Sequence, residues 1–145
     1  MKNPSWLDIA FNERGVKSFP AGTSNPRIEE YHRSISNCKW SDKIPWCSSF
    51  LHWSMSEAGL DGTGSALARS WLYWGGPIDQ PRHGCVVVLW REQPDSPKGH
   101  VGLFLEQDSK HVHLWGGNQL DEVREHFYPN NMVLGYRWPT DCHLP

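Results

Sequence analysis

The sequence predicts one α+β domain, in which N-terminal helices pack on a C-terminal antiparallel β-sheet. The chain has 145 residues, which is about the length of one average domain. Apolar residues recur at helical spacing in its first half, and from Cys85 onward their spacing becomes that of extended strands. Helices that precede a run of strands, rather than alternate with them, are typical of α+β architecture.

Each expected helix has a start or stop signal. Asn followed by Pro is typical of a helix start, because the Asn side chain caps the first turn and Pro lacks an N–H that would be unpaired there. Gly is typical of the position just after a helix ends. These signals and the apolar spacing predict helices between Asn3-Pro4 and Gly15, from Asn25-Pro26 through Ile35, from Trp46 to Ala58 and, as a shorter element, from Ser65 to Trp74.

Five runs rich in β-branched and aromatic residues follow, and polar turns separate them. We expect these strands to form an antiparallel meander. The first run is apolar on successive residues, which predicts that both of its faces are covered, one of them by the third helix. The expected strands are Cys85–Arg91, His100–Glu106, His111–Trp115, Glu122–Tyr128 and Val133–Trp138.

Charge and hydropathy exclude several classes of function. The 14 Lys and Arg against 16 Asp and Glu give a net charge of −2, whereas a protein that binds nucleic-acid phosphates needs a basic excess on one face. No run of about 18 apolar residues and no basic amphipathic stretch occurs. We therefore expect neither nucleic acid nor a membrane as a partner. Charged side chains interrupt the first fifteen residues, so we expect no signal peptide and synthesis in the cytoplasm.

The four cysteines lie far apart, at positions 38, 47, 85 and 142, and form no C-x-x-C pair. This spacing is too sparse for a disulfide scaffold and lacks the ligand spacing of a zinc ribbon. Whether Cys38 pairs with Cys142 stays open. We expect no metal or other cofactor; the alternative is a zinc site built from some of His83, Cys85, His100, His111 and His113.

Cys47 is the candidate nucleophile. Pro45 disfavours helix for the residue before it, so the third helix is expected to begin near Trp46 or Cys47. A thiol in the first turn of a helix lies near unpaired backbone N–H groups and the positive end of the helix dipole, and both stabilise a thiolate. The same N–H groups could stabilise an oxyanion. The alternative is that Cys47 is one more small, buried apolar residue.

A thiolate nucleophile needs a base, and His100 is the candidate. It follows Gly99 at the start of an expected strand, where a side chain is held rigidly at the rim of a sheet. Asn118, in the segment LWGGNQ, is the candidate for orienting the imidazole. His113 is its rival, and the alternative for His113 is a solvent-facing position on its strand.

These residues belong to a longer series of motifs. PWCSSF at a helix start is followed in order by PRHGCVVVLWR, GHVGLFLE, LWGGNQ and LGYRWP. In this order the motifs resemble the NlpC-type and CHAP-type cell-wall cysteine peptidases, which are papain-like bacterial enzymes that cut amide bonds in peptidoglycan. The resemblance is strongest to a small branch that also carries SNPRI and GTGSALARSW, and it extends from about Trp6 to Pro139.

The resemblance implies a papain-like fold in one domain over residues 1–145, with a core at about 6–139. It implies that Cys47 is the nucleophile, that His100 is the base and later the acid, and that Asn118 orients His100. Many NlpC-type enzymes have a His as the third residue, and His113 nearly fills that position. The chain departs from its relatives at Cys85, where they have Asp. The implied function is a peptidoglycan amidase or endopeptidase acting through a thioester; the alternative is an inactive wall-binding module of this fold.

Substrate contacts and delivery are further expectations. Arg69 in GTGSALARSW could bind a peptide carboxylate; the alternative is a solvated Arg69 on a helix packed by Ala66, Leu67 and Trp71. Trp46, Trp74 and Trp115 could line the groove. Without a leader, the protein fits a toxin that another system carries to the cell wall, or a phage lysis enzyme. A toxin would require a tightly binding immunity protein as its partner. We expect the protein to be a monomer.

Overall fold

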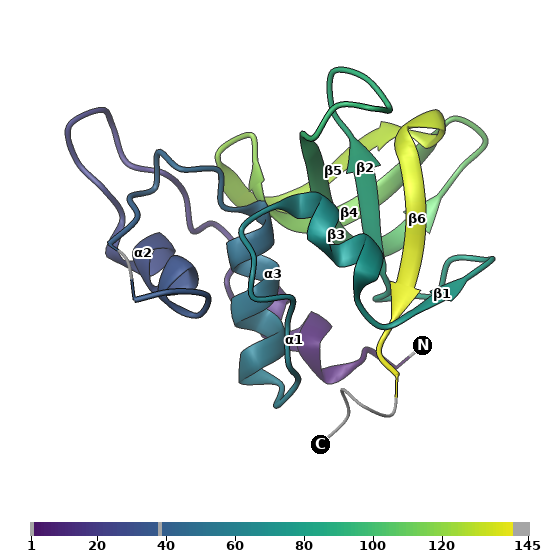
Figure 1. The fold of residues 1–145 in the computed structure, drawn as a ribbon, viewed down its shortest axis with the longest axis horizontal. Helices are drawn as coiled ribbons and strands as arrows, with labels where there is room; N and C mark the ends of the chain where they lie inside the picture. Colours follow the sequence, from purple (N-terminus) through teal and green to yellow (C-terminus); the bar gives the residue numbers. More distant parts are fainter. Residues whose placement is uncertain (1, 38, 141–145) are drawn as a thin grey trace.

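The computed structural model describes residues 2–37 and 39–140, in which helices pack against a curved, six-stranded antiparallel sheet. In Figure 1 the helices α1, α2 and α3 lie to one side of the sheet. The helices are α1 (Ser5–Phe11), α2 (Pro26–Arg33), α3 (Cys47–Glu57) and the 3₁₀ helices η1 (Ala68–Tyr73) and η2 (Asn130–Met132). The strands are β1 (Gly76–Ile78), β2 (Val86–Trp90), β3 (Gly99–Gln107), β4 (His111–Gln119), β5 (Glu122–Pro129) and β6 (Val133–Trp138).

The strands lie in the order β1-β6-β2-β3-β4-β5. The α+β prediction is confirmed, and β2 through β5 form the expected meander. A simple meander would also place β6 beside β5, but β6 returns to the other side of the sheet and pairs with β2. The edge strand β1 was not predicted, because its sequence, Gly-Pro-Ile, gives almost no strand signal.

Each face of the sheet packs its own apolar cluster. Val86 and Val88 of β2 belong to the cluster shared with the helices. Val87 and Leu89, which alternate with them, belong to a second cluster on the other face. The prediction that both faces of this strand are covered is therefore confirmed. The helix that mainly covers β2 is η1 rather than α3, because α3 packs on β3 and β4.

The predicted start of α2 is correct, whereas the predicted start of α1 is wrong by one residue. α2 begins as expected, with the Asn25 side chain accepting a hydrogen bond from the N–H of Arg27 at 2.9 Å. α1 begins one residue later than expected, since Pro4 takes the N-cap position and makes no side-chain cap. The Asn3 amide donates to the Asp8 carboxylate instead, at 2.8 Å.

No helix within the described residues is long and apolar enough to cross a bilayer. Cys47 and Cys85 are free thiols. The open question of a bond between Cys38 and Cys142 lies outside the described residues.

Candidate active site

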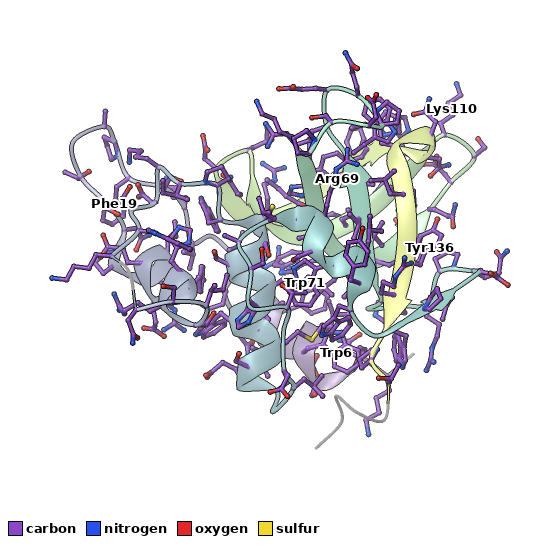
Figure 2. All side chains as sticks on the ribbon, viewed as in Figure 1. Trp6, Phe19, Arg69, Trp71, Lys110 and Tyr136 are labelled. Atoms are coloured by element: carbon purple, nitrogen blue, oxygen red, sulfur yellow. The ribbon has the colours of Figure 1, made fainter. Side chains whose placement is uncertain are left out.

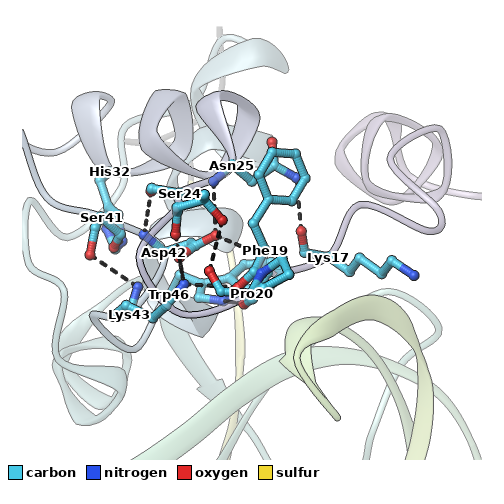
Figure 3. Close-up of polar contacts among 12 residues, drawn as sticks. Lys17, Phe19, Pro20, Ser24, Asn25, His32, Ser41, Asp42, Lys43 and Trp46 are labelled. Atoms are coloured by element: carbon cyan, nitrogen blue, oxygen red, sulfur yellow. Dashed lines mark hydrogen bonds and ion pairs between the residues drawn. The ribbon is translucent and has the colours of Figure 1, made fainter.

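Cys47 is the first residue of α3, and buried polar contacts fix the loop that leads into this helix. The carboxylate of Asp42 accepts hydrogen bonds from the backbone N–H groups of Phe19 and Asn25, each at 2.8 Å (Figure 3). The ammonium group of Lys43 donates to the carbonyl of Phe19 at 2.9 Å. The loop before α3 is therefore tied to the loop before α2, and the position of Cys47 is set by both.

The thiol of Cys47 and the imidazole of His100 are hydrogen-bonded across the junction of α3 and β3. Burial raises the pKa of Cys47, but the charge and hydrogen bond of His100 and the N–H groups of Val101 and Ser48 outweigh it and lower that pKa. Burial lowers the pKa of His100, but Cys47 and the Gln119 hydrogen bond outweigh it and raise that pKa. The two opposite shifts favour a thiolate–imidazolium pair.

Gln119 fixes which nitrogen of His100 carries a proton. Nε2 of His100 lies 3.0 Å from Oε1 of Gln119. The amide nitrogen of Gln119 donates to the backbone carbonyls of Leu114 and Arg124, at 3.1 and 2.7 Å. Because the amide donors are used in this way, Oε1 must accept, and Nε2 of His100 must donate. This assigns the contact with Cys47 to Nδ1.

Tyr128 lies against the same imidazole. Its hydroxyl is 3.2 Å from Nε2 of His100, and the two ring centroids are 5.2 Å apart. Burial and the nearby Cys47 raise the pKa of Tyr128, so its hydroxyl keeps its proton at neutral pH. Neither Tyr128 nor Gln119 was singled out from the sequence, although Gln119 ends the LWGGNQ motif.

We expected Asn118 to contact His100, but the next residue in the chain, Gln119, makes this contact instead. Asn118 has a φ of 56°, and the pairing of β4 with β5 shifts register between Gly116 and Gln119. Such an irregularity re-aims the side chains that follow it, and Asn tolerates the left-handed backbone better than most residues. Asn118 thus supplies the backbone conformation, and it lines the cavity described below.

The two glycines before Asn118 permit two close approaches. A Cβ on Gly116 would lie 2.7 Å from Oε1 of Gln119. A Cβ on Gly117 would lie 2.6 Å from Cβ of Phe50 in α3. The first glycine therefore admits the amide that holds His100, and the second lets the helix that carries Cys47 approach the sheet.

His113 lies elsewhere. Its Nδ1 is 3.1 Å from the carboxylate of Glu125, and its Nε2 is 3.5 Å from that of Asp108, both exposed residues. It does not line the cavities at Cys47. The structure therefore favours the alternative in which His113 lies on the outer face of the sheet.

The zinc candidates do not converge within the described part of the chain. Nε2 of His83 is 2.7 Å from the Asn3 amide oxygen, and Cys85 is buried in the second apolar cluster. Glu106, His113 and Glu125 are the His, Cys, Asp or Glu side chains there whose ligand atoms do converge, within 4.8 Å of one another.

Two cavities meet at Cys47. The one we call the Tyr128 cavity has a volume of about 380 Å³ and is lined by His100, Tyr128 and the turn between β4 and β5. The one we call the Leu67 cavity has a volume of about 330 Å³ and is lined by residues 66–68 and 97–99. Pro45, Cys47 and Arg91 line both. A chain that crosses the thiol would therefore occupy both cavities.

The segment GTGSALARSW borders the Leu67 cavity, but Arg69 has another role than the expected one. Figure 2 labels Arg69, which belongs to η1. Its guanidinium donates to three backbone carbonyls in the connection between β2 and β3, those of Lys98, Pro94 and Gln93, at 2.8, 2.9 and 3.2 Å. A guanidinium that holds three carbonyls supports the connection, and the expected carboxylate contact of Arg69 is corrected accordingly.

The three tryptophans expected in the groove are core residues, and none lines either cavity. A buried indole needs a partner for its N–H, and each of these three has one. The indole of Trp46 donates to Oγ of Ser18, that of Trp74 to the carbonyl of Asp61, and that of Trp115 to the carbonyl of Ala10.

The ion pair predicts fast alkylation of Cys47 below the ordinary thiol pKa. At about pH 6, iodoacetamide should label Cys47 at least roughly 100-fold faster in the wild type than in His100→Ala, since that variant keeps the burial that raises the thiol pKa but loses its cation. Cys85 is the internal comparison, because burial raises its pKa to about 11. Mass spectrometry of tryptic peptides gives both rates, and equal labelling of Cys47 in the two proteins would contradict the ion pair.

The turn between β4 and β5 predicts a stabilising substitution. Leu120 and Asp121 both have positive φ values, 56° and 63°, and Leu120 is 63% exposed. Leu120→Asn should raise the free energy of unfolding by about 1 kcal/mol, because a left-handed backbone costs Leu roughly that much and Asn less. Leu67→Asn is the matched control, since Leu67 is 67% exposed with a φ of −81°. Urea unfolding of both variants tests this, and equal changes would show that the turn is not strained.

Comparisons with known proteins indicate the fold. No family model and no curated protein matches the sequence. Among solved structures, the chain is similar to a Staphylococcus aureus protein described as similar to lipoprotein, of the NLP/P60 family, with a TM-score of 0.53 and 12% identity. The match covers 94% of this chain but 41% of that protein. The chain therefore has an α+β fold like that of this NLP/P60 protein.

Proposed function

We propose that the protein is a cysteine peptidase or amidase that cleaves an amide bond in the peptide part of peptidoglycan. The observation that carries this proposal is the hydrogen-bonded pair of Cys47 and His100 at the meeting point of two open cavities. A structural thiol packs as a small apolar group and does not require an imidazole partner, whereas an adjacent imidazole activates a thiol as a nucleophile. The motif resemblance and the NLP/P60-like fold support peptidoglycan as the substrate.

The first half of the reaction forms a thioester. In the ion pair, Nδ1 of His100 already holds the proton of the thiol, so Sγ of Cys47 can attack the carbonyl carbon of the scissile amide directly. The carbonyl electrons move to oxygen, and the first N–H groups of α3, which have no partner within the helix, can stabilise that oxyanion. The C–N bond then breaks as Nδ1 gives its proton to the leaving amine.

The second half restores the enzyme. His100 is now neutral at Nδ1 and takes a proton from a water molecule, whose hydroxyl adds to the thioester carbonyl. The C–S bond breaks, Sγ leaves as a thiolate, and the acid product departs. Nε2 of His100 remains bonded to Gln119 in both halves, so the imidazole keeps its orientation while Nδ1 exchanges the proton.

The proposed activity is compatible with two biological roles. Antibacterial toxins and phage lysis enzymes are the two roles that we propose for a cell-wall hydrolase of this kind. For a toxin, an immunity protein that covers the meeting point of the two cavities would block the thiol from both sides.

Purified peptidoglycan tests the activity. The wild type should release new amine ends and lower the turbidity of isolated cell walls, and mass spectrometry of the fragments should identify the bond that is cut. Cys47→Ala should abolish the release, since no other described thiol lines the cavities. Binding to cell walls without cleavage by either protein would point instead to an inactive wall-binding module.

Gln119 should act as a positioning residue with a signature in the pH profile. Gln119→Ala should lower kcat by about 100-fold, at the lower end of what a positioned acid–base group contributes. The Gln119 hydrogen bond raises the pKa of His100, and the imidazolium is lost as the pH rises through that pKa. Its removal should therefore move the alkaline limb of the profile to lower pH.

Asn118→Gly is the matched comparison for this experiment. Gly accepts the left-handed backbone of Asn118, so this variant should keep the alkaline limb of the wild type. A shift of that limb in Asn118→Gly but not in Gln119→Ala would return the orienting role to Asn118.

A further inference from the structure

Arg91 is the cation at the point where the two cavities meet. It follows β2 directly and lines both the Tyr128 cavity and the Leu67 cavity, as Cys47 does. Its charge acts on His100 and on Tyr128. Any substrate that places an amide carbonyl at the thiol therefore passes beside this guanidinium.

The guanidinium of Arg91 has no hydrogen-bond or ion-pair partner within residues 2–37 and 39–140, and the side chain is exposed. Other cations near the cavities are occupied. Arg69 donates hydrogen bonds to the three carbonyls described above, and Lys98 forms an ion pair with Glu92 at 2.9 Å. Lys43 bonds to the Phe19 carbonyl. Arg91 is thus the cavity-lining cation in the described residues that is free to bind an anion.

Two hydrogen bonds to one carbonyl connect the backbone of Arg91 to η1. The N–H of Arg91 donates to the carbonyl of Lys98 at 3.4 Å, across the connection between β2 and β3. The same carbonyl accepts a hydrogen bond from Arg69 of η1 at 2.8 Å. Because the connection is supported from η1, a ligand need not order this backbone when it binds, and this lowers the entropic cost of binding.

We propose that Arg91 binds a carboxylate of the substrate beside the scissile amide, so that the substrate is an acidic peptide. This inference rests on the proposed function and specifies its substrate class. The planar guanidinium can donate two parallel hydrogen bonds to one carboxylate, which fixes the orientation as well as the position of the peptide. Asp121 also lines the Tyr128 cavity and carries the opposite charge, which disfavours the binding of an acidic group beside Asp121.

Pairs of peptide substrates test the proposal. Each pair has the same sequence, with the carboxylate next to the scissile amide either free or converted to an amide. The wild type should prefer the free acid by roughly tenfold or more in kcat/KM, as expected for hydrogen bonds to a charged group. Arg91→Gln should remove the preference, through kcat as well as KM, and Arg91→Lys should keep part of it. Arg33→Gln is the control for the change in net charge, because Arg33 is an exposed residue of α2. A preference that survives in Arg91→Gln would overturn the proposal.

A second measurement does not depend on hydrolysis. Iodoacetate and iodoacetamide differ in a carboxylate, so the ratio of their rates at Cys47 reports the attraction of an anion to this site. The ratio should fall by roughly fivefold in Arg91→Gln and stay unchanged in Arg33→Gln. A fall without any peptide hydrolysis would support the anion site and refute the proposed function. Hydrolysis with an unchanged ratio and no preference for the acid would refute the role of Arg91 alone.

Discussion

The contact between Cys47 and His100 depends on how closely α3 can approach the sheet. Either side chain alone would be costly to ionise, because both are over nine-tenths buried and burial disfavours each ionised form. Together they offset that cost, since each ion is the other's counter-ion. The arrangement works only while the first turn of α3 lies against the start of β3. The contact between Cys47 and His100 therefore requires Gly117, because a Cβ there would collide with Phe50 and push α3 away from the sheet.

Backbone strain in the site is concentrated in one short segment. Asn118, Leu120 and Asp121 all have positive φ values, and all three line the Tyr128 cavity. The irregular pairing between β4 and β5 aims the amide of Gln119 at His100, and the turn that follows presents Leu120 to solvent. Left-handed backbone at non-glycine residues persists where the surrounding structure compensates for it, and it clusters at functional sites. Here the hydrogen bonds of Gln119 to Leu114 and Arg124 supply part of that compensation.

The sequence was informative where one residue and its local backbone decide the outcome. Cys47 at a helix start could be placed from Pro45, which restricts the residue before it. His100 at a strand start could be placed from Gly99 and the run of strand-forming residues that follows it. The orienting residue could not, because a single irregular pair in β4 changes which of Asn118 and Gln119 faces inward. Arg69 and Arg91 were also indistinguishable, since the sequence does not reveal which guanidinium meets backbone carbonyls. Tryptophan is common both in binding grooves and in cores, so the sequence alone did not decide between these places. In the structure the indole N–H groups of three core residues each donate a hydrogen bond, those of Trp46, Trp74 and Trp115.

The charge of Arg91 connects substrate binding to the state of the reacting pair. A positive charge beside His100 opposes its protonation and so works against the ion pair that Cys47 favours. In our proposal a substrate carboxylate pairs with Arg91 and cancels this opposition. The imidazolium would then be most stable when an acidic peptide is in place, which is also when its proton is needed by the leaving amine. Binding energy gained at Arg91 would thereby be expressed in the reaction as well as in affinity, because it stabilises the imidazolium that pairs with the Cys47 thiolate and later gives its proton to the leaving amine.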